Sequence, residues 1–230
     1  MRFRVFPIAL AAAAVFSSQA AGDPPSLTGT PIVLTSGWSV YSFALNDSGT
    51  VVFAGGGWGG ADGLVKVRPN SFLKFASRGD PVPGVPGSLF TGFASGRFGN
   101  FSLNNRDEVA FAAFYAACGD PAEIDACSRT HQQYSGLFHY SDGVIRAIAL
   151  DGEPVPGSEG QIFHFFEQVR LNNTGMILFR GQFGSAERPG VEMLKSALFL
   201  WSDGRFSRVS PEDVIVSTEG QGLIAFTDEG

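Results

Sequence analysis

An eleven-residue phrase recurs three times in the sequence, as FALNDSGTVVF at 43–53, FSLNNRDEVAF at 101–111 and VRLNNTGMILF at 169–179. When the copies are aligned on their asparagine, each has an apolar residue six positions later and a phenylalanine seven positions later. The copies lie roughly 60 residues apart, which is the length of a supersecondary module with variable loops. This spacing predicts a fold in which similar units pack against one another.

Each phrase is predicted to form a β-turn between two strands. The asparagine begins the turn by hydrogen bonding back to the main chain, and a glycine three residues later supplies a positive φ. Aspartate replaces that glycine in the middle copy and tolerates the same conformation. The strand that follows is apolar on consecutive residues, which is typical of a strand covered on both faces. The motif residues, with the phenylalanines as expected core residues, are Asn46, Gly49, Phe53, Asn104, Asp107, Phe111, Asn172, Gly175 and Phe179.

A second hairpin is predicted after each phrase, at 63–76, 136–149 and 197–209. An Asp-Gly pair lies between two strand-like runs in the last two of these segments, and this is a strong hairpin signal. The proline-containing segments RGDPVPG and DGEPVPG then connect one unit to the next, because proline cannot donate a ladder hydrogen bond. The sequence therefore predicts an all-β fold of repeated four-stranded antiparallel meanders, β-propeller-like in arrangement.

The predicted units span about 31–84, 85–157 and 158–210, with a partial fourth unit at 211–230. The fourth begins with EGQGLIAF at 219–226, where glutamate replaces the expected asparagine. Propellers usually have four to eight blades, so three units and a fragment are too few to predict a closed ring. Either the last strands pair with the segment PIVLTSG at 31–37, or the chain is a shortened member of a longer family.

The three phrases resemble the NxxGxxAF tandem repeat of secreted, often surface-anchored bacterial proteins. Asp107 stands in place of the motif glycine in the second copy, and Val52 and Leu178 stand in place of the motif alanine in the first and third. The resemblance covers about residues 31–226 and implies a propeller-like repeat architecture. It implies no established reaction.

The N-terminus is predicted to be a secretory signal peptide spanning residues 1–21, followed by a β-repeat domain at 22–230. Arg2 and Arg4 precede an apolar run at 5–16, and Ser18 and Ala20 suit a cleavage site. The run has about 12 residues, fewer than the roughly 20 needed to span a bilayer. We therefore expect an exported protein, extracellular or periplasmic, whose mature chain does not insert into a membrane. The net charge of −6, without basic clusters, argues against nucleic-acid binding.

The two cysteines, Cys118 and Cys127, are predicted to form a disulfide. Export to an oxidising compartment favours a bond between cysteines this close in the sequence. Between them, Asp120 followed by Pro121 suits the start of a short helix.

The sequence offers few candidates for chemistry. GGGWGG at 55–60 matches a phosphate-binding pattern, but a strand-like run follows it where a dinucleotide site requires a helix. Trp58 at its centre either stacks on a sugar ring, as a weak binding candidate, or folds back onto the core. The three histidines lack a metal-binding spacing. We predict no catalytic residues, no metal and no cofactor.

Two functions fit these observations. The first is an exported, non-enzymatic β-repeat protein with a role in recognition or surface structure, whose ligand is unknown and whose expected partner is a carbohydrate or another cell-surface component. The alternative is an extracellular glycan-active hydrolase or lyase on the same scaffold. That activity requires two carboxylates about 5 to 9 Å apart across a cleft, and the candidate acids include Asp80, Asp151 and Glu153.

Overall fold

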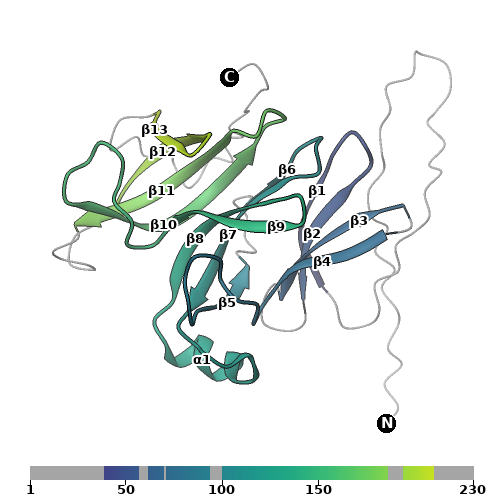
Figure 1. Ribbon diagram of the computed structural model, residues 1–230, viewed down its shortest axis with the longest axis horizontal. Coiled ribbons are helices and arrows are strands. Elements are labelled where there is room, and N and C mark those ends of the chain that lie inside the picture. The colour runs from purple at the N-terminus through teal and green to yellow at the C-terminus, as the bar shows by residue number, and fades with distance from the viewer. Residues whose placement is uncertain (1–38, 57–61, 70, 94–99, 186–193, 210–230) are drawn as a thin grey trace, which may run out of the picture.

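The computed structural model describes residues 39–56, 62–69, 71–93, 100–185 and 194–209, which form three antiparallel sheets, none of them closed (Figure 1). The all-β fold with propeller-like, incomplete repeats is as predicted. The signal peptide, Trp58 and the segments 31–37 and 219–226 lie outside the described residues.

The first and third sheets are four-stranded meanders, as the sequence predicts. Sheet 1 has the order β1-β2-β3-β4 and sheet 3 the order β10-β11-β12-β13, so neighbouring strands follow one another in the chain. The strands of sheet 1 are β1 (Ser39–Leu45), β2 (Val51–Gly56), β3 (Gly63–Arg68) and β4 (Ser71–Ser77). Those of sheet 3 are β10 (Gln161–Leu171), β11 (Ile177–Ser185), β12 (Lys195–Ser202) and β13 (Arg205–Arg208).

Sheet 2 departs from the predicted four strands because its first strand is divided. Both β5 (Leu89–Phe93) and β6 (Phe101–Leu103) pair with β7 (Val109–Ala116), whereas β10 alone occupies this place in sheet 3. Residues 94–99, between these two strands, lie outside the described residues. The sheet continues with β8 (Tyr134–Ser141) and β9 (Val144–Leu150).

The Asp-Gly pairs form the predicted hairpin turns. Asp142 and Gly143 have φ values of 52° and 79°, and Asp203 and Gly204 have 49° and 77°. Positive φ at both central residues defines the type I′ turn, whose twist matches that of the flanking strands. The connecting segments are confirmed too, because each makes a single β-bridge, through Pro81 or Pro154, to the first strand of the next sheet.

The loop between β7 and β8 carries the helical residues and the predicted disulfide. Asp120 caps a 3₁₀ turn (Pro121–Glu123) by accepting a hydrogen bond from the Ala122 amide at 2.8 Å. The helix α1 (Ile124–Thr130) follows and projects from the sheets (Figure 1). Cys118 and Cys127 are joined by a disulfide, which ties this helix back to the end of β7.

Two aromatic cores hold the three sheets together. The first contains Phe111 of sheet 2 with Val52 and Ala54 of sheet 1, and the second contains Phe179 of sheet 3 with Ala110 and Ala112 of sheet 2. In each pair of neighbouring sheets, the motif phenylalanine of the later sheet packs against the earlier sheet. The core that it enters includes a small or branched residue from the phrase of the earlier sheet, Val52 for Phe111 and Ala110 for Phe179. Adjacent residues of a strand point to opposite faces of the sheet. The sixth and seventh residues after the motif asparagine therefore pack into two different cores.

Candidate functional site

The three motif turns lie side by side where the sheets meet. They follow β1, β6 and β10, which end at Leu45, Leu103 and Leu171 as predicted. The predicted positive φ is confirmed at all three third positions: 78° at Gly49, 63° at Asp107 and 93° at Gly175. The asparagines that begin the turns, Asn46, Asn104 and Asn172, are buried.

Each asparagine side chain fixes its own turn, as predicted. Its Oδ1 accepts a hydrogen bond from the amide four residues later, at 2.9 Å from Thr50, 3.0 Å from Glu108 and 2.9 Å from Met176. The main-chain amide of each asparagine donates in return to the carbonyl of that same residue, at 3.1 Å in all three turns. The turn is therefore closed by both the main chain and the side chain.

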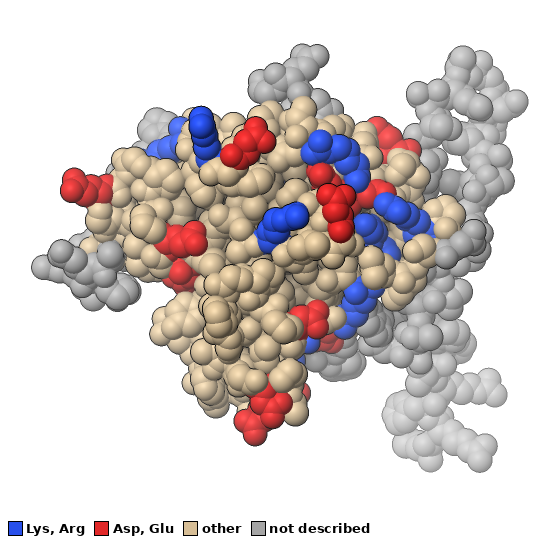
Figure 2. Space-filling view, in the orientation of Figure 1, with Lys and Arg blue, Asp and Glu red and all other residues tan. Residues whose placement is uncertain are grey.

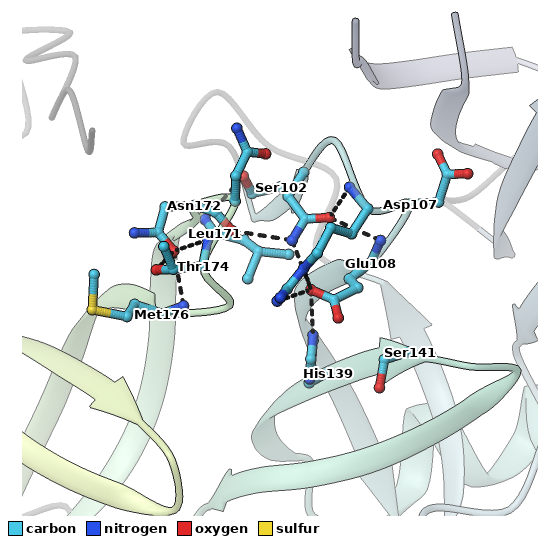
Figure 3. A network of polar contacts seen from close by, with 12 residues as sticks. Ser102, Asp107, Glu108, His139, Ser141, Leu171, Asn172, Thr174 and Met176 are labelled. Atoms are coloured by element: carbon cyan, nitrogen blue, oxygen red, sulfur yellow. Dashed lines mark hydrogen bonds and ion pairs between the residues drawn. The ribbon is translucent and has the colours of Figure 1, made fainter. Parts of the chain in front are cut away.

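The asparagines also join one turn to the next. Asn46 Nδ2 donates to the carbonyl of Asn104, and Asn104 Nδ2 donates to the carbonyl of Asn172, both at 3.0 Å. The following residues repeat the pattern, because the amide of Asp47 donates to Asn105 Oδ1 at 3.0 Å and the amide of Asn105 to Asn173 Oδ1 at 2.7 Å. We call this arrangement the turn ladder. It runs across all three sheets, and its second step is drawn in Figure 3.

The turn ladder explains why asparagine is needed at these positions. A short amide offers an oxygen with two acceptor sites and a nitrogen with two donors. Asn104 uses all four: Oδ1 accepts from the amides of Arg106 and Glu108 at 3.0 Å, and Nδ2 donates to Asn172 and to Glu108 Oε2 at 2.7 Å. The contacts between turns were not predicted from the sequence. One signal for them was available, because a residue with a side-chain oxygen follows every motif asparagine: Asp47, Asn105 and Asn173.

Charged side chains surround the middle turn. Glu108 Oε2 also accepts from Arg106 Nη2 at 2.8 Å, and Asp107 forms an ion pair with Arg68 of sheet 1. Asp107 Oδ1 accepts from Asn46 Nδ2 at 2.7 Å, so the aspartate in place of glycine adds a further hydrogen bond between sheets 1 and 2. Acidic and basic side chains are interspersed over the face of the molecule seen in Figure 2.

His139 lies at the edge of this cluster and points toward Glu108 (Figure 3). Its Nε2 is 3.9 Å from Glu108 Oε2 and makes no hydrogen bond in the structure. Burial lowers the pKa of His139 from 6.5, and the nearby Glu108 opposes this effect only partly. The imidazole is therefore neutral at neutral pH.

The lowered pKa of His139 predicts an acid-sensitive fold. The folded chain takes up the His139 proton at lower pH than the unfolded chain does, so this group costs stability as the pH falls below 6.5. Replacing His139→Gln is expected to flatten the change in the urea midpoint between about pH 7.5 and about pH 5.5. His131→Gln is the matched control, because His131 is exposed and should leave that change as in the wild type. Equal pH dependence in the wild type and His139→Gln would contradict the assignment.

A second prediction concerns the conformation of the first turn. Gly49→Val is expected to lower the free energy of unfolding by about 1–3 kcal/mol, because a β-branched residue resists positive φ. Nothing lies within 4 Å of a Cβ built at Gly49, so the cost comes from the backbone alone. Gly49→Asn is the control and should cost less than about 1 kcal/mol, since asparagine tolerates this region. Equal urea midpoints for the two variants would show that the turn conformation does not set the cost.

Of the acids considered for catalysis, Asp80 and Asp151 are held in local contacts, whereas Glu153 is exposed. Asp80 accepts from the amide of Ser77 at 2.7 Å, and Asp151 lies 3.4 Å from His164, where burial raises the pKa of the carboxyl although His164 opposes the shift. A hollow of about 570 Å³ beside the β12–β13 hairpin has a single carboxylate, Asp203, among its lining residues. Within the described ranges, no three His, Cys, Asp or Glu side chains gather as ligands for a metal ion, and no helix is long and apolar enough to cross a membrane.

A model of a known protein family matches residues 8–212, which includes all three motif phrases. The chain belongs to DUF7453, a family of unknown function. Comparison of this DUF7453 chain with curated proteins and with solved structures found no match. The turn ladder is therefore the feature of the DUF7453 chain from which function has to be argued.

Proposed function

We propose that this chain is an exported, non-enzymatic protein built from tandem β-repeats, which presents its loops for recognition or surface structure. The observation that carries the proposal is the turn ladder, in which the polar residues of each phrase bond to the next phrase. A motif whose side chains join neighbouring units has the role expected of a scaffold. The similarity of the phrases to the NxxGxxAF repeat supports the same function.

The use of hydrogen bonds at Asn104 supports a scaffold rather than a catalytic centre. A catalytic side chain keeps donors or acceptors directed at the reacting atoms of a substrate. Asn104 instead directs two acceptor sites at its own turn and two donors at Asn172 and Glu108. Its complete hydrogen bonding in a buried position rigidifies the junction between sheets.

The proposal of export has two supports. The first 21 residues have the composition of a signal peptide, and the Cys118–Cys127 disulfide fits an oxidising compartment. On such a scaffold the hairpin ends at Asp142-Gly143 and Asp203-Gly204 are available as a recognition surface, and all four of these residues are exposed. Carbohydrates and cell-surface components are the ligands we propose.

A combined binding and turnover experiment tests this proposal. The chain is recovered after export, applied to a glycan array, and incubated with extracellular polysaccharides while new reducing ends and unsaturated products are measured. We expect binding without turnover. A matched preparation from cells that lack the gene controls for contaminating enzymes, and turnover above that control would favour the hydrolase or lyase alternative. Retention of the chain in the cytoplasm would contradict export.

A further inference from the structure

His139 occupies a position that the repeat places between neighbouring sheets. In each sheet, one residue lies opposite the sixth residue after the motif asparagine, and these residues are Lys66, His139 and Leu200. Their side chains lie on the same face as that sixth residue, because directly opposed residues of paired strands share a face. The three equivalent positions therefore hold a lysine, a histidine whose charge depends on pH, and a leucine.

The lysine shows that this fold accepts a cation at that position. Lys66 Nζ lies 4.7 Å from the centre of the Tyr140 ring on sheet 2, and a cation is attracted to the face of an aromatic ring. The ring of His139 is 6.2 Å from that of Trp201 on sheet 3. Tyr140 and Trp201 hold equivalent places, because each directly follows the residue at this position in its own sheet. A protonated imidazole would thus have an aromatic neighbour, as the ammonium of Lys66 has.

The Nε2 atom of neutral His139 faces a carboxylate that other groups already use. It is buried, has no hydrogen-bond partner, and lies 3.9 Å from Glu108 Oε2 (Figure 3). That oxygen accepts from Asn104 Nδ2 at 2.7 Å and from Arg106 Nη2 at 2.8 Å. The same Asn104 Nδ2 donates to Asn172, so Glu108 supports the second step of the turn ladder.

Charged groups of both signs surround His139. Burial lowers the pKa of His139 most; Glu108 and Asp142 act against this effect, and Arg146 and Arg106 add to it. Arg146 lies opposite His139 in register on β9. The neighbour from sheet 3 is the uncharged indole described above. Of the two acids, Glu108 is the one at ion-pair distance from the imidazole.

We propose that His139 is a proton switch for the contact between sheets 2 and 3. When the imidazole takes up a proton from solvent, Nε2 donates to Glu108 Oε2 and takes the place of Asn104 Nδ2 there. Both partners of the new bond carry a charge, whereas the amide of Asn104 is neutral. The second step of the turn ladder then loses the support of Glu108, while the first step, from Asn46 to Asn104, keeps its bond. Acid therefore loosens sheet 3 from sheet 2 within the folded chain.

An NMR titration of the whole chain from about pH 7.5 to about pH 5 tests the switch in the range where histidine changes charge. The signals followed are those of the His139 ring and of the side-chain amides of Asn104 and Asn46. We expect the Asn104 amide signal to shift with the same midpoint as the His139 ring, below pH 6.5. The Asn46 amide signal should stay in place, because the residue at the equivalent position in sheet 1 is a lysine.

Two variants fix the switch in one state each. His139→Lys gives sheet 2 the cation that sheet 1 has at Lys66, so at about pH 7 the Asn104 amide should already show its acid position. His139→Gln keeps a neutral side chain, so the Asn104 amide should stay at its neutral position throughout. His131→Gln is the matched control, because His131 is exposed and the variant should titrate as the wild type does.

Glu108→Gln tests the partner of the switch. Glu108 raises the pKa of His139, so the His139 ring in this variant should titrate at a lower pH than in the wild type. The Asn104 amide should then no longer follow the ring.

Three results would each overturn the proposal. In the wild type, the Asn104 amide stays in place while the His139 ring titrates, or the ring does not titrate above about pH 5. In His139→Gln, the Asn104 amide still shifts with pH. In His139→Lys at neutral pH, the Asn104 amide keeps its wild-type position. None of these results bears on export or on enzymatic activity, so failure here leaves the proposed function standing.

Discussion

Phe111→Ala is expected to lower the free energy of unfolding by about 3–5 kcal/mol, as truncation of a large core side chain does. Phe111 is fully buried at the centre of the core between sheets 1 and 2. Its ring centre is 5.5 Å from that of Phe138, which stacks on it, and 6.1 Å from that of Phe93. It also contacts Phe75 of sheet 1 at 6.2 Å, so the truncation loosens the contact between the two sheets.

Urea unfolding followed by tryptophan fluorescence measures this loss. Phe43→Ala is the matched control, because the same atoms are removed from a side chain that is 63% exposed. The control should cost less than about 1 kcal/mol, since exposed positions contribute little. Similar midpoints for the two variants would show that Phe111 is not a core residue.

The fold class was predictable because one local rule is written three times in the sequence. The asparagine and the residue with positive φ are determined by contacts within the turn itself, and both were predicted correctly. The Asp-Gly turns are local in the same sense. Register within a hairpin follows from such turns, so the strand order of sheets 1 and 3 required no long-range information.

The remaining features depend on contacts between units, for which a single sequence gives weaker signals. The division of the first strand of sheet 2 into β5 and β6 is one such feature, because it depends on how the chain leaves β7 and pairs with it again. Phe111 and Phe53 hold the same motif position but have different neighbours. Phe111 packs in a core with residues of sheet 1, whereas Phe53 clusters with Val65 and Val67 of its own sheet. The turn ladder joins residues from different sheets, and an amide that closes its own turn looks identical in sequence to one that also binds its neighbour.

The turn ladder leads to the second large expected effect, at Asn104. Asn104→Asp keeps Oδ1, which accepts from the amides of Arg106 and Glu108, but it replaces the Nδ2 donor by a carboxylate oxygen. That oxygen would face the carbonyl of Asn172 and the carboxylate of Glu108, the groups to which Nδ2 donates at 3.0 and 2.7 Å. Like charges and facing acceptors in a buried position are costly, so we expect a loss of about 2–4 kcal/mol in the free energy of unfolding.

A double-variant experiment separates the turn ladder from the turn itself. Because Glu108→Gln removes one of the two facing charges, adding it to Asn104→Asp should recover part of the lost stability, and the coupling between the two substitutions measures that repulsion. Asn104→Ala removes the acceptor and the donor together, so it should also expose the amides of Arg106 and Glu108 to faster hydrogen exchange, which Asn104→Asp should leave protected. If Asn104→Asp were as stable as the wild type at neutral pH, the amide nitrogen would not be joining the sheets, and the scaffold role argued from the turn ladder would lose its support.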